Sequence, residues 1–438
     1  MRAAMYLGVE STLQISEQKW SGRVFAVIAL LLAFGLAGCQ PKVYLMPTPV
    51  ALTTGEIDLF GRTGPADKGT SVPVLYATNR VPLSTADERV YSIFASDEVR
   101  LGLASLRIGD DSLDWEALRA LSQRASKEKR PLLVLESVQE SATLDVNAAD
   151  AGLSTQAREY FDHVNRALAE SADKDLMIYV HGANANVYRA TAQAAQYRHF
   201  TGRNSVVLAF AWPSAASLLK YSTDVSHAAK TAPLLARFLK LLALHTEARN
   251  INILAYSAGA QVTSPALALL GDEFSDRPGA REKLRLGEVY FAAPDVNFKD
   301  FVNHLSRYVT LPRNVTITVN LEDDVLALAQ FHHNESRAGR PDLKELSEEE
   351  TRWLIDATKQ PNFDVINIDP TTVKDLWEGS HGYWYDHPWV STDVLVQFRL
   401  HARPAERGLI EAKAPKGGRY WLFPPDYDSR IIKLLRRQ

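Results

Sequence analysis

Apolar strands alternate with helices along the chain after Ala157, and this alternation constrains the fold more than any other feature of the sequence. The strands are short apolar runs bounded by turn-forming residues, at residues 175–182, 205–214, 251–257, 287–295, 314–324 and 363–369. A strand that is apolar along its whole length is buried on both faces of its sheet. We therefore predict an α/β fold in which helices cover both faces of a mostly parallel central sheet. The functional side chains of such a sheet gather at the carboxyl ends of its strands.

The rest of the chain adds to this core at both ends. At 438 residues the chain is long for one average domain, so we expect one core with additions. Segments rich in valine, leucine and isoleucine precede the alternating part and are predicted as strands, at residues 72–80, 99–109 and 131–138. Residues 71–438 are therefore predicted to form one domain with N-terminal strands and a C-terminal extension. Prolines and glycines interrupt residues 39–70 without a period, which predicts a flexible tether.

The N-terminal segment has the composition of an export signal. Lys19 and Arg23 precede an apolar run at residues 24–36, which is too short for a confident membrane span and suits the core of a signal peptide. The run ends in the letters LAGC, and Cys39 is the only cysteine of the chain. This order resembles the lipobox of bacterial lipoproteins. The resemblance implies that residues 1–38 are removed as a lipoprotein signal peptide and that Cys39 is lipid-modified.

A lipid anchor would give the protein a membrane as one of its partners. Acyl chains attached to Cys39 would hold an otherwise soluble domain at a bilayer through their buried methylene groups. The residue after the cysteine is Gln40 rather than aspartate. Under the sorting rule of such lipoproteins, this implies a location in the cell envelope, at the outer membrane and facing the periplasm.

Charge and motif content exclude several classes of protein. The formal net charge is −3, which gives no reason to expect a nucleic-acid partner. The sequence contains no H-E-x-x-H or G-x-x-x-x-G-K motif, and its single cysteine cannot supply a cysteine cluster. We therefore expect no metal ion and no cofactor.

The strand at residues 251–257 ends in the letters AYSAG, with Ser257 among small residues. A serine at a sharp strand-to-helix turn projects its hydroxyl from the sheet, and the strained backbone tolerates only small residues two positions away. Those positions hold Ala255 and Gly259, so the pattern is A-x-S-x-G in place of G-x-S-x-G. Ser257 is thus a candidate nucleophile, although a buried strand that meets a helix through small residues is also a common structural corner.

A candidate oxyanion hole lies one strand–helix unit upstream, in the letters VHGANAN at residues 180–186. An oxyanion hole needs two backbone N–H groups that point at one position, one after the nucleophile and one from the loop of this earlier strand. Ala258 supplies the first. Gly182 permits a tight turn, so the N–H of Ala183 or, failing that, of Asn184 is predicted to supply the second.

An acid and a histidine are expected after the serine, in the order Ser, Asp, His. The strand at residues 314–324 ends in acids, and either Asp323 or Asp324 can orient a histidine, with Asp323 favoured. Asp295, after the strand before, is a third candidate. The histidine is predicted to be His381, because it follows the last predicted strand on a loop with glycines on both sides.

Several motifs in order resemble the α/β-hydrolase superfamily, and within it a bacterial group known as DUF900. The resemblance covers residues 74–396 and rests on the letters YATNR, VHGANANV, FAWPS, YSAGAQV, AAPDVN and SHGYWYDHPWVSTDVL. One departure is Tyr256, where the family usually has histidine before the serine, and it concerns the fit of the substrate. The WPS letters are expected to brace the loop beside the pocket, with Trp212 as a further candidate for substrate contact.

Together these features predict a serine hydrolase that cleaves a small-molecule or lipid acyl ester, in the manner of a carboxylesterase or lipase. The triad would be Ser257, His381 and Asp323, and the reaction would pass through an acyl-enzyme intermediate. Two alternatives stay open. The same triad can serve an amidase or peptidase, and the fold can serve as a lipid-anchored, non-catalytic binding or scaffold protein.

Overall fold

The computed structural model describes residues 42–53, 55–86, 89–125, 130–146, 152–215 and 221–436. The chain divides into two units, Met1–Lys42 and Val43–Gln438, and the helices and strands below belong to the second. The predicted signal peptide, with Cys39 and Gln40, lies outside the described residues. Among the described residues, no helix is both long and apolar enough to cross a membrane.

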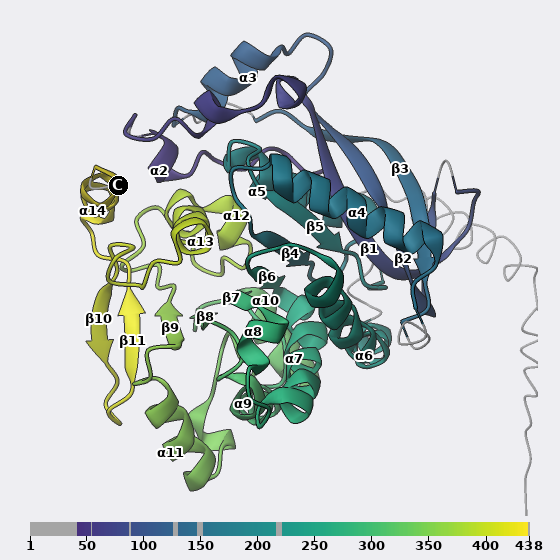
Figure 1. Cartoon of the computed structure of the whole chain (residues 1–438). Helices are drawn as coiled ribbons and strands as arrows, with labels where there is room; N and C mark the ends of the chain where they lie inside the picture. Colours follow the sequence, from purple (N-terminus) through teal and green to yellow (C-terminus); the bar gives the residue numbers. More distant parts are fainter. Residues whose placement is uncertain are drawn as a thin grey trace, which may run out of the picture. The chain divides into compact units, whose positions relative to one another are not determined.

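One sheet of eleven strands forms the centre of the second unit (Figure 1). Its order is β10-β11-β9-β8-β7-β6-β4-β5-β1-β2-β3. Every pair of neighbours from β11 to β1 is parallel, and only the edge pairs β1–β2, β2–β3 and β10–β11 are antiparallel. The strands are β1 Ser71–Pro82, β2 Tyr91–Ile108, β3 Leu133–Leu144, β4 Leu176–Val180, β5 Val206–Phe210, β6 Ile251–Tyr256, β7 Leu286–Ala292, β8 Asn314–Val319, β9 Phe363–Asn367, β10 Ile410–Lys413 and β11 Arg419–Leu422.

Helices connect the parallel strands and flank the sheet (Figure 1). They are α2 Val50–Thr53, α3 Trp115–Ser122, α4 Thr155–Glu170, α5 Val187–Phe200, α6 Tyr221–His245, α7 Ala260–Phe274, α8 Ala280–Leu284, α9 Phe298–Tyr308, α10 Asp324–His333, α11 Glu348–Ala357, α12 Tyr383–Asp386, α13 Pro388–Leu400 and α14 Tyr427–Leu435. Short 3-10 helices are η1 Leu59–Arg62, η2 Pro65–Asp67, η5 Ser257–Gly259 and η6 Leu343–Glu345.

Two apolar cores lie on opposite faces of the sheet, because successive strand residues point to opposite faces. On β4, Ile178 belongs to the core that contains side chains of α4, α6, α7 and α9. The next residue, Tyr179, belongs to the core that contains side chains of α5 and α13. The predicted α/β fold, with a mostly parallel sheet and helices on both faces, is therefore confirmed.

Residues 43–70 differ from the predicted tether. Leu45, Met46 and Phe60 are buried in the same core as α5 and α13. The segment also contains α2, η1 and η2. Prolines and glycines break the helix and strand periods here, but an absent period carries no information on whether isolated apolar side chains find a place in a core.

Candidate active site

The turn from β6 into α7 holds Ser257 in a strained conformation. β6 ends at Tyr256, and η5 leads directly into α7. The φ angle of Ser257 is 51°, in the left-handed region that residues other than glycine rarely adopt. This is the geometry expected of a serine at a sharp strand-to-helix elbow, where the hydroxyl lies beyond the end of the strand.

Close packing requires glycine at two positions around this turn. A Cβ atom on Gly259 would lie 2.4 Å from the carbonyl oxygen of Val180, at the end of β4. A Cβ atom on Gly182 would lie 2.9 Å from the Cβ of Ser257. Both distances are shorter than real Cβ contacts, so the loop after β4 lies directly against the serine turn.

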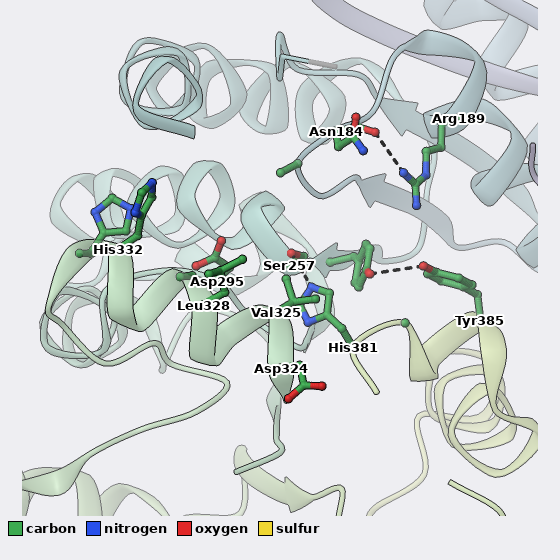
Figure 2. Close-up of a pocket in the computed structure, with 15 residues that line it drawn as sticks. Asn184, Arg189, Ser257, Asp295, Asp324, Val325, Leu328, His332, His381 and Tyr385 are labelled. Carbon is green, nitrogen blue, oxygen red and sulfur yellow. Dashed lines mark hydrogen bonds between the residues drawn. The ribbon is translucent and has the colours of Figure 1, made fainter. Parts of the chain in front are cut away.

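Three predicted site residues come together at the carboxyl end of the sheet. Figure 2 shows two of them, Ser257 and His381. The Nε2 atom of His381 lies 2.8 Å from Oγ of Ser257, and its Nδ1 atom lies 2.7 Å from Oδ2 of Asp323. These residues follow β9, β6 and β8, respectively. In this position the imidazole can accept the proton of the serine hydroxyl while its other nitrogen donates to the carboxylate.

The two acids left open by the sequence have different surroundings. Asp323 is fully buried, and its Oδ1 atom caps α10 by accepting from the N–H of Leu326 at 2.9 Å. Asp324 is exposed, and its carboxylate lies against Gly379 at the edge of the cavity. Of the two, Asp323 is the one that bonds His381.

The loop that carries His381 is fastened to the loop that carries Asp323. The side-chain N–H of Asn320 donates to the carbonyl oxygen of Ser380 at 2.9 Å. The backbone N–H of Asp324 donates to the carbonyl oxygen of Gly379 at 3.4 Å. These bonds join the loop after β8 to the loop after β9, and so fix the position of the imidazole relative to the carboxylate.

The amides predicted to form an oxyanion hole flank Ser257. Ala258 follows the serine at the beginning of the helical segment, where free backbone N–H groups are found. Ala183 and Asn184 line the same cavity as Ser257. In the part of the chain that the structure describes, the N–H groups of Ala183 and Asn184 have no hydrogen-bond partner. The carbonyl oxygen of Asn184 accepts from Arg189 at 3.1 Å.

Sequence reasoning gave no role to Arg80, which ties the surrounding loops together. Its buried guanidinium donates to the carbonyl oxygens of Ala185 and Trp212, both at 2.7 Å. Further acceptors are the carbonyl oxygens of Ser92, Ala211 and Ser214. Burial lowers the pKa of Arg80 to about 10, although the charge of Asp224 acts in the opposite direction. The available signal was an arginine at the end of the apolar strand letters VPVLYATNR.

Trp212 packs against His181, at the beginning of the loop after β4. The rings stack with centroids 5.5 Å apart, and Nε1 of Trp212 donates to the carbonyl oxygen of His181 at 2.7 Å. Burial, together with the nearby charge of Arg80, lowers the pKa of His181 to about 3, so the imidazole is neutral at physiological pH. Trp212 is fully buried and does not line the cavity. It therefore packs against the loop and does not occupy a position from which it could contact a substrate in this cavity.

Asp224 and Asp295 bond to segments beside the candidate site. The carboxylate of Asp224 accepts from the N–H of Ala215 at 2.6 Å, and burial raises the pKa of Asp224 to about 6. Asp295, the third candidate for the acid, accepts from Nε of Arg337 at 2.6 Å, and both side chains are almost fully buried. The N–H of Asp295 donates to the carbonyl oxygen of Ser257 at 3.0 Å, which stabilises the strained turn.

A cavity of about 510 Å³ opens at Ser257 and His381. Asn184 and Arg189 lie on one side of the serine, and Val325 and Leu328 of α10 lie on the other (Figure 2). The α10 side of the cavity thus presents the apolar side chains of Val325 and Leu328 beside the polar side chains of Asp324 and His332.

Tyr256, the departure from the family pattern, forms part of the same cavity. Its ring centroid lies 5.4 Å from that of His381, and its hydroxyl lies 3.4 Å from that of Tyr385. His332 and His333, at the end of α10, line the same cavity. No group of three or more histidine, cysteine or acidic side chains suited to a metal ion occurs within the described ranges.

The comparison with family models agrees with the fold. Residues 156–399 match the model of a family described as alpha/beta hydrolase of unknown function, DUF900. Among solved structures, a lipase-esterase related protein from Clostridium acetobutylicum ATCC 824 is similar at 12% identity and a TM-score of 0.28, over 53% of this chain and 96% of that one. A likeness at that TM-score supports no conclusion about activity. No curated protein matches this chain.

Proposed function

Because this chain belongs to the DUF900 family of α/β hydrolases, we propose that it is a serine hydrolase that cleaves carboxylic esters. The observation that carries the proposal is the position of His381, 2.8 Å from the hydroxyl of Ser257 and 2.7 Å from the carboxylate of Asp323. A serine hydroxyl becomes a nucleophile when a base in hydrogen-bond contact accepts its proton, and the base is effective when a third group orients it.

In the proposed acylation step, Oγ of Ser257 attacks the ester carbonyl carbon, and Nε2 of His381 takes the hydroxyl proton. The carbonyl oxygen becomes an oxyanion that accepts from the N–H of Ala258 and from the N–H of Ala183. Asp323 stays ionised and stabilises the imidazolium. Cleavage of the ester C–O bond then releases the alcohol, which receives its proton from His381, and the acyl group remains on Ser257.

Deacylation repeats the chemistry with water. His381 removes a proton from the water molecule, whose oxygen attacks the acyl carbon and forms a second oxyanion. Cleavage of the bond between that carbon and Oγ releases the carboxylic acid, and His381 returns the proton to the oxygen of Ser257. The oxyanion-hole contacts are stronger in these transition states than in the ground state, which is why they accelerate the reaction.

Mass spectrometry after treatment with a fluorophosphonate tests the nucleophile. We expect one adduct on Ser257, formed as the serine oxygen displaces fluoride from phosphorus. Ser257→Ala should remove the adduct, and His381→Ala should slow its formation by orders of magnitude. Folded protein that forms no adduct would favour the scaffold alternative.

Matched ester and amide substrates test the bond that is cleaved. We expect turnover of p-nitrophenyl esters and much slower turnover of the corresponding p-nitroanilides. Amide turnover at the same rate or faster would make the protein an amidase or peptidase with the same triad.

We also propose that the protein is exported and anchored in the cell envelope through lipid on Cys39. The order of basic residues, apolar run, small residues and cysteine supports this location. A hydrolase held in this way would meet small-molecule or lipid acyl esters at the surface of the membrane.

A further inference from the structure

Helix α10, which begins beside the triad acid, exposes apolar side chains. Only Leu326 of this helix is buried. Val325 is 41% exposed, Leu328 is 60% exposed and Phe331 is 84% exposed. After Asp324 the helix contains no aspartate, glutamate, lysine or arginine. Single exposed apolar residues are ordinary, but a cluster of them on one helix marks a binding surface.

Two of these side chains also form the wall of the active-site cavity. Val325 and Leu328 line the cavity of about 510 Å³ together with Ser257 and His381. They are three positions apart, so they lie on one face of the helix. Figure 2 shows both on the side of α10 that faces the serine. Phe331, although more exposed, does not line this cavity.

The rest of the cavity wall is more polar, although it also includes the rings of Tyr256 and Tyr385, whose hydroxyls bond each other. It contains Arg189 and Asn184, and the guanidinium of Arg189 donates to the carbonyl oxygen of Asn184. An apolar group placed there would cover polar atoms without a hydrogen bond in return, which is unfavourable. The apolar part of a bound substrate is therefore directed toward α10.

We propose that Val325 and Leu328 form a subsite for the hydrocarbon chain of the ester substrate. The inference rests on the proposed function and narrows its substrate class, from any ester to esters with a chain long enough to reach α10 from Ser257. Burial of one methylene group is worth up to about a fourfold gain in kcat/KM. Esters with medium-length chains should consequently be better substrates than acetates.

The test measures kcat/KM for p-nitrophenyl esters from acetate to dodecanoate, dissolved below their micelle concentrations, and for a matching series of alkyl acetates. The first series lengthens the acyl side and the second lengthens the alcohol side. We expect the ratio of octanoate to acetate, or of octyl to ethyl ester, to exceed one by at least about tenfold in the natural protein. The polar double variant Val325→Thr/Leu328→Gln should lower this ratio by about tenfold.

Phe331→Gln is the matched control, because it removes an exposed apolar side chain from the same helix but outside the cavity. It should leave the ratio unchanged. The inference is overturned if the natural protein shows no preference for longer chains in either series. An equal loss of the ratio in Phe331→Gln would also overturn it, because the preference would then not depend on the side chains that line the cavity.

Labelling of Ser257 by the fluorophosphonate separates this inference from the proposed function. A labelled serine with no chain-length preference rejects the subsite and keeps the hydrolase. Folded protein that neither labels nor turns over any ester rejects both. Retained labelling of Ser257 in the double variant would show that a changed ratio does not come from an unfolded α10.

Discussion

Among single residues, Asp323 and Asp324 are chain neighbours with opposite surroundings. Asp323 is buried and bonded to His381, whereas Asp324 is exposed at the cavity rim. Asp323→Asn keeps the shape and the cap of α10 but favours the wrong tautomer of the histidine, so we expect kcat to fall by about 10⁴-fold. Asp324→Asn should change kcat by less than about threefold. Measurement of kcat for ester hydrolysis by both variants tests this prediction. A larger loss in Asp324→Asn would contradict the assignment of Asp323 as the acid that orients His381.

Arg80 should be as important for stability as the proposed triad is for chemistry. Its guanidinium donates to five backbone carbonyl oxygens, a set of acceptors that a lysine ammonium cannot reach. Those of Ala185, Ala211 and Trp212 have a second donor, whereas those of Ser92 and Ser214 depend more on Arg80. Each buried acceptor left without a donor costs about 1–3 kcal/mol. We expect Arg80→Lys to lower the free energy of unfolding by at least about 2 kcal/mol in urea titrations. Arg430→Lys, at an exposed ion pair with Asp426, should cost less than about 0.5 kcal/mol, and equal losses would refute a special role for Arg80.

A functional residue could be predicted from the sequence when its pattern is contiguous in the chain, and could not when its contacts are distant in sequence. Ser257 was predictable because the strand, the small neighbours and the turn are contiguous in the chain. The bonds of Arg80 join it to residues far away in sequence, such as Ala185 and Ser214. No local pattern encodes such contacts. A buried role for Arg80 therefore became visible only when β1 and β5 were placed side by side.

At the level of elements, the sequence predicted the presence of the strands better than the residues at which they end. Each of the nine predicted strands is present, but β8 ends at Val319 rather than near residue 324. The acids that seemed to end the strand instead belong to the turn before α10, where Asp323 is the cap. β10 and β11 were not predicted. They are short, and charged residues such as Glu411 and Arg419 interrupt their apolar pattern.

The junction between β4 and the serine turn is the element contact with the least space. Gly259→Ala would place a methyl group 2.4 Å from the carbonyl oxygen of Val180. Because backbone must shift to accept it, we expect a lower Tm and loss of fluorophosphonate labelling at Ser257. Gly64→Ala is the control, since no atom lies within 4 Å of the added carbon and φ there is −62°. Normal labelling of Gly259→Ala would show that the turn tolerates movement.

At the scale of the whole molecule, the second unit begins at Val43, four residues after the predicted lipid site at Cys39. Four residues reach at most about 15 Å, so an anchored domain would stay close to the bilayer surface. We expect Cys39→Ser to move the protein from the membrane fraction to the soluble fraction with its hydrolase activity unchanged. Gln40→Asp should keep the lipid but change the membrane in which the protein is found. Unaltered fractionation of Cys39→Ser would reject the anchor.

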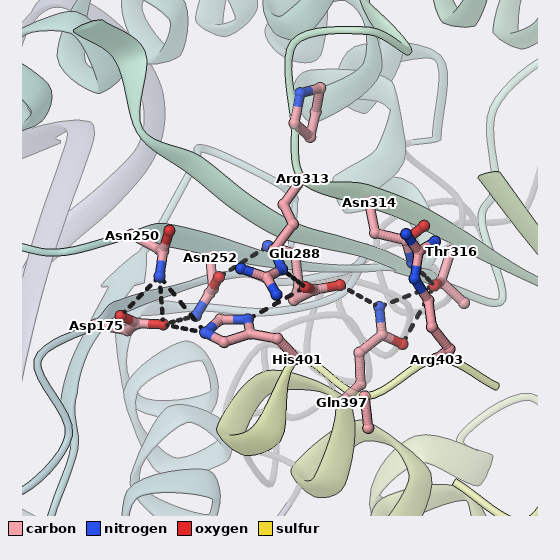
Figure 3. A network of polar contacts seen from close by, with 12 residues as sticks. Asp175, Asn250, Asn252, Glu288, Arg313, Asn314, Thr316, Gln397, His401 and Arg403 are labelled. Carbon is pink, nitrogen blue, oxygen red and sulfur yellow. Dashed lines mark hydrogen bonds and ion pairs between the residues drawn. The ribbon is translucent and has the colours of Figure 1, made fainter. Parts of the chain in front are cut away.

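A network of polar side chains lies at the amino-terminal ends of the parallel strands, opposite the candidate active site (Figure 3). His401, at the end of α13, lies 2.9 Å from the carboxylate of Asp175 and 3.1 Å from that of Glu288. Asp175 precedes β4 and Glu288 lies in β7, which are separated in the sheet by β6. The hydrogen bonds to Asp175 and Glu288 raise the pKa of His401 to about 9. The imidazolium thus joins a helix to strands that do not touch each other.

This charge makes global stability depend on pH in a defined window. The pKa of His401 in the folded state lies above its ordinary value of about 6.5, so its contribution is complete below pH 6.5 and is lost as the pH rises through about 9. Allowing for solvent screening, we expect the free energy of unfolding to fall by about 2 kcal/mol across that window.

His401→Gln should be less stable at pH 6 and should lose most of this slope, whereas His163→Gln, at an exposed histidine of α4, should keep it. Urea titrations at intervals between pH 6 and pH 9.5 measure the slope directly. If His401→Gln kept the slope of the natural protein, the pH dependence would have to come from other groups. The charge of His401 would then add nothing to the free energy of unfolding.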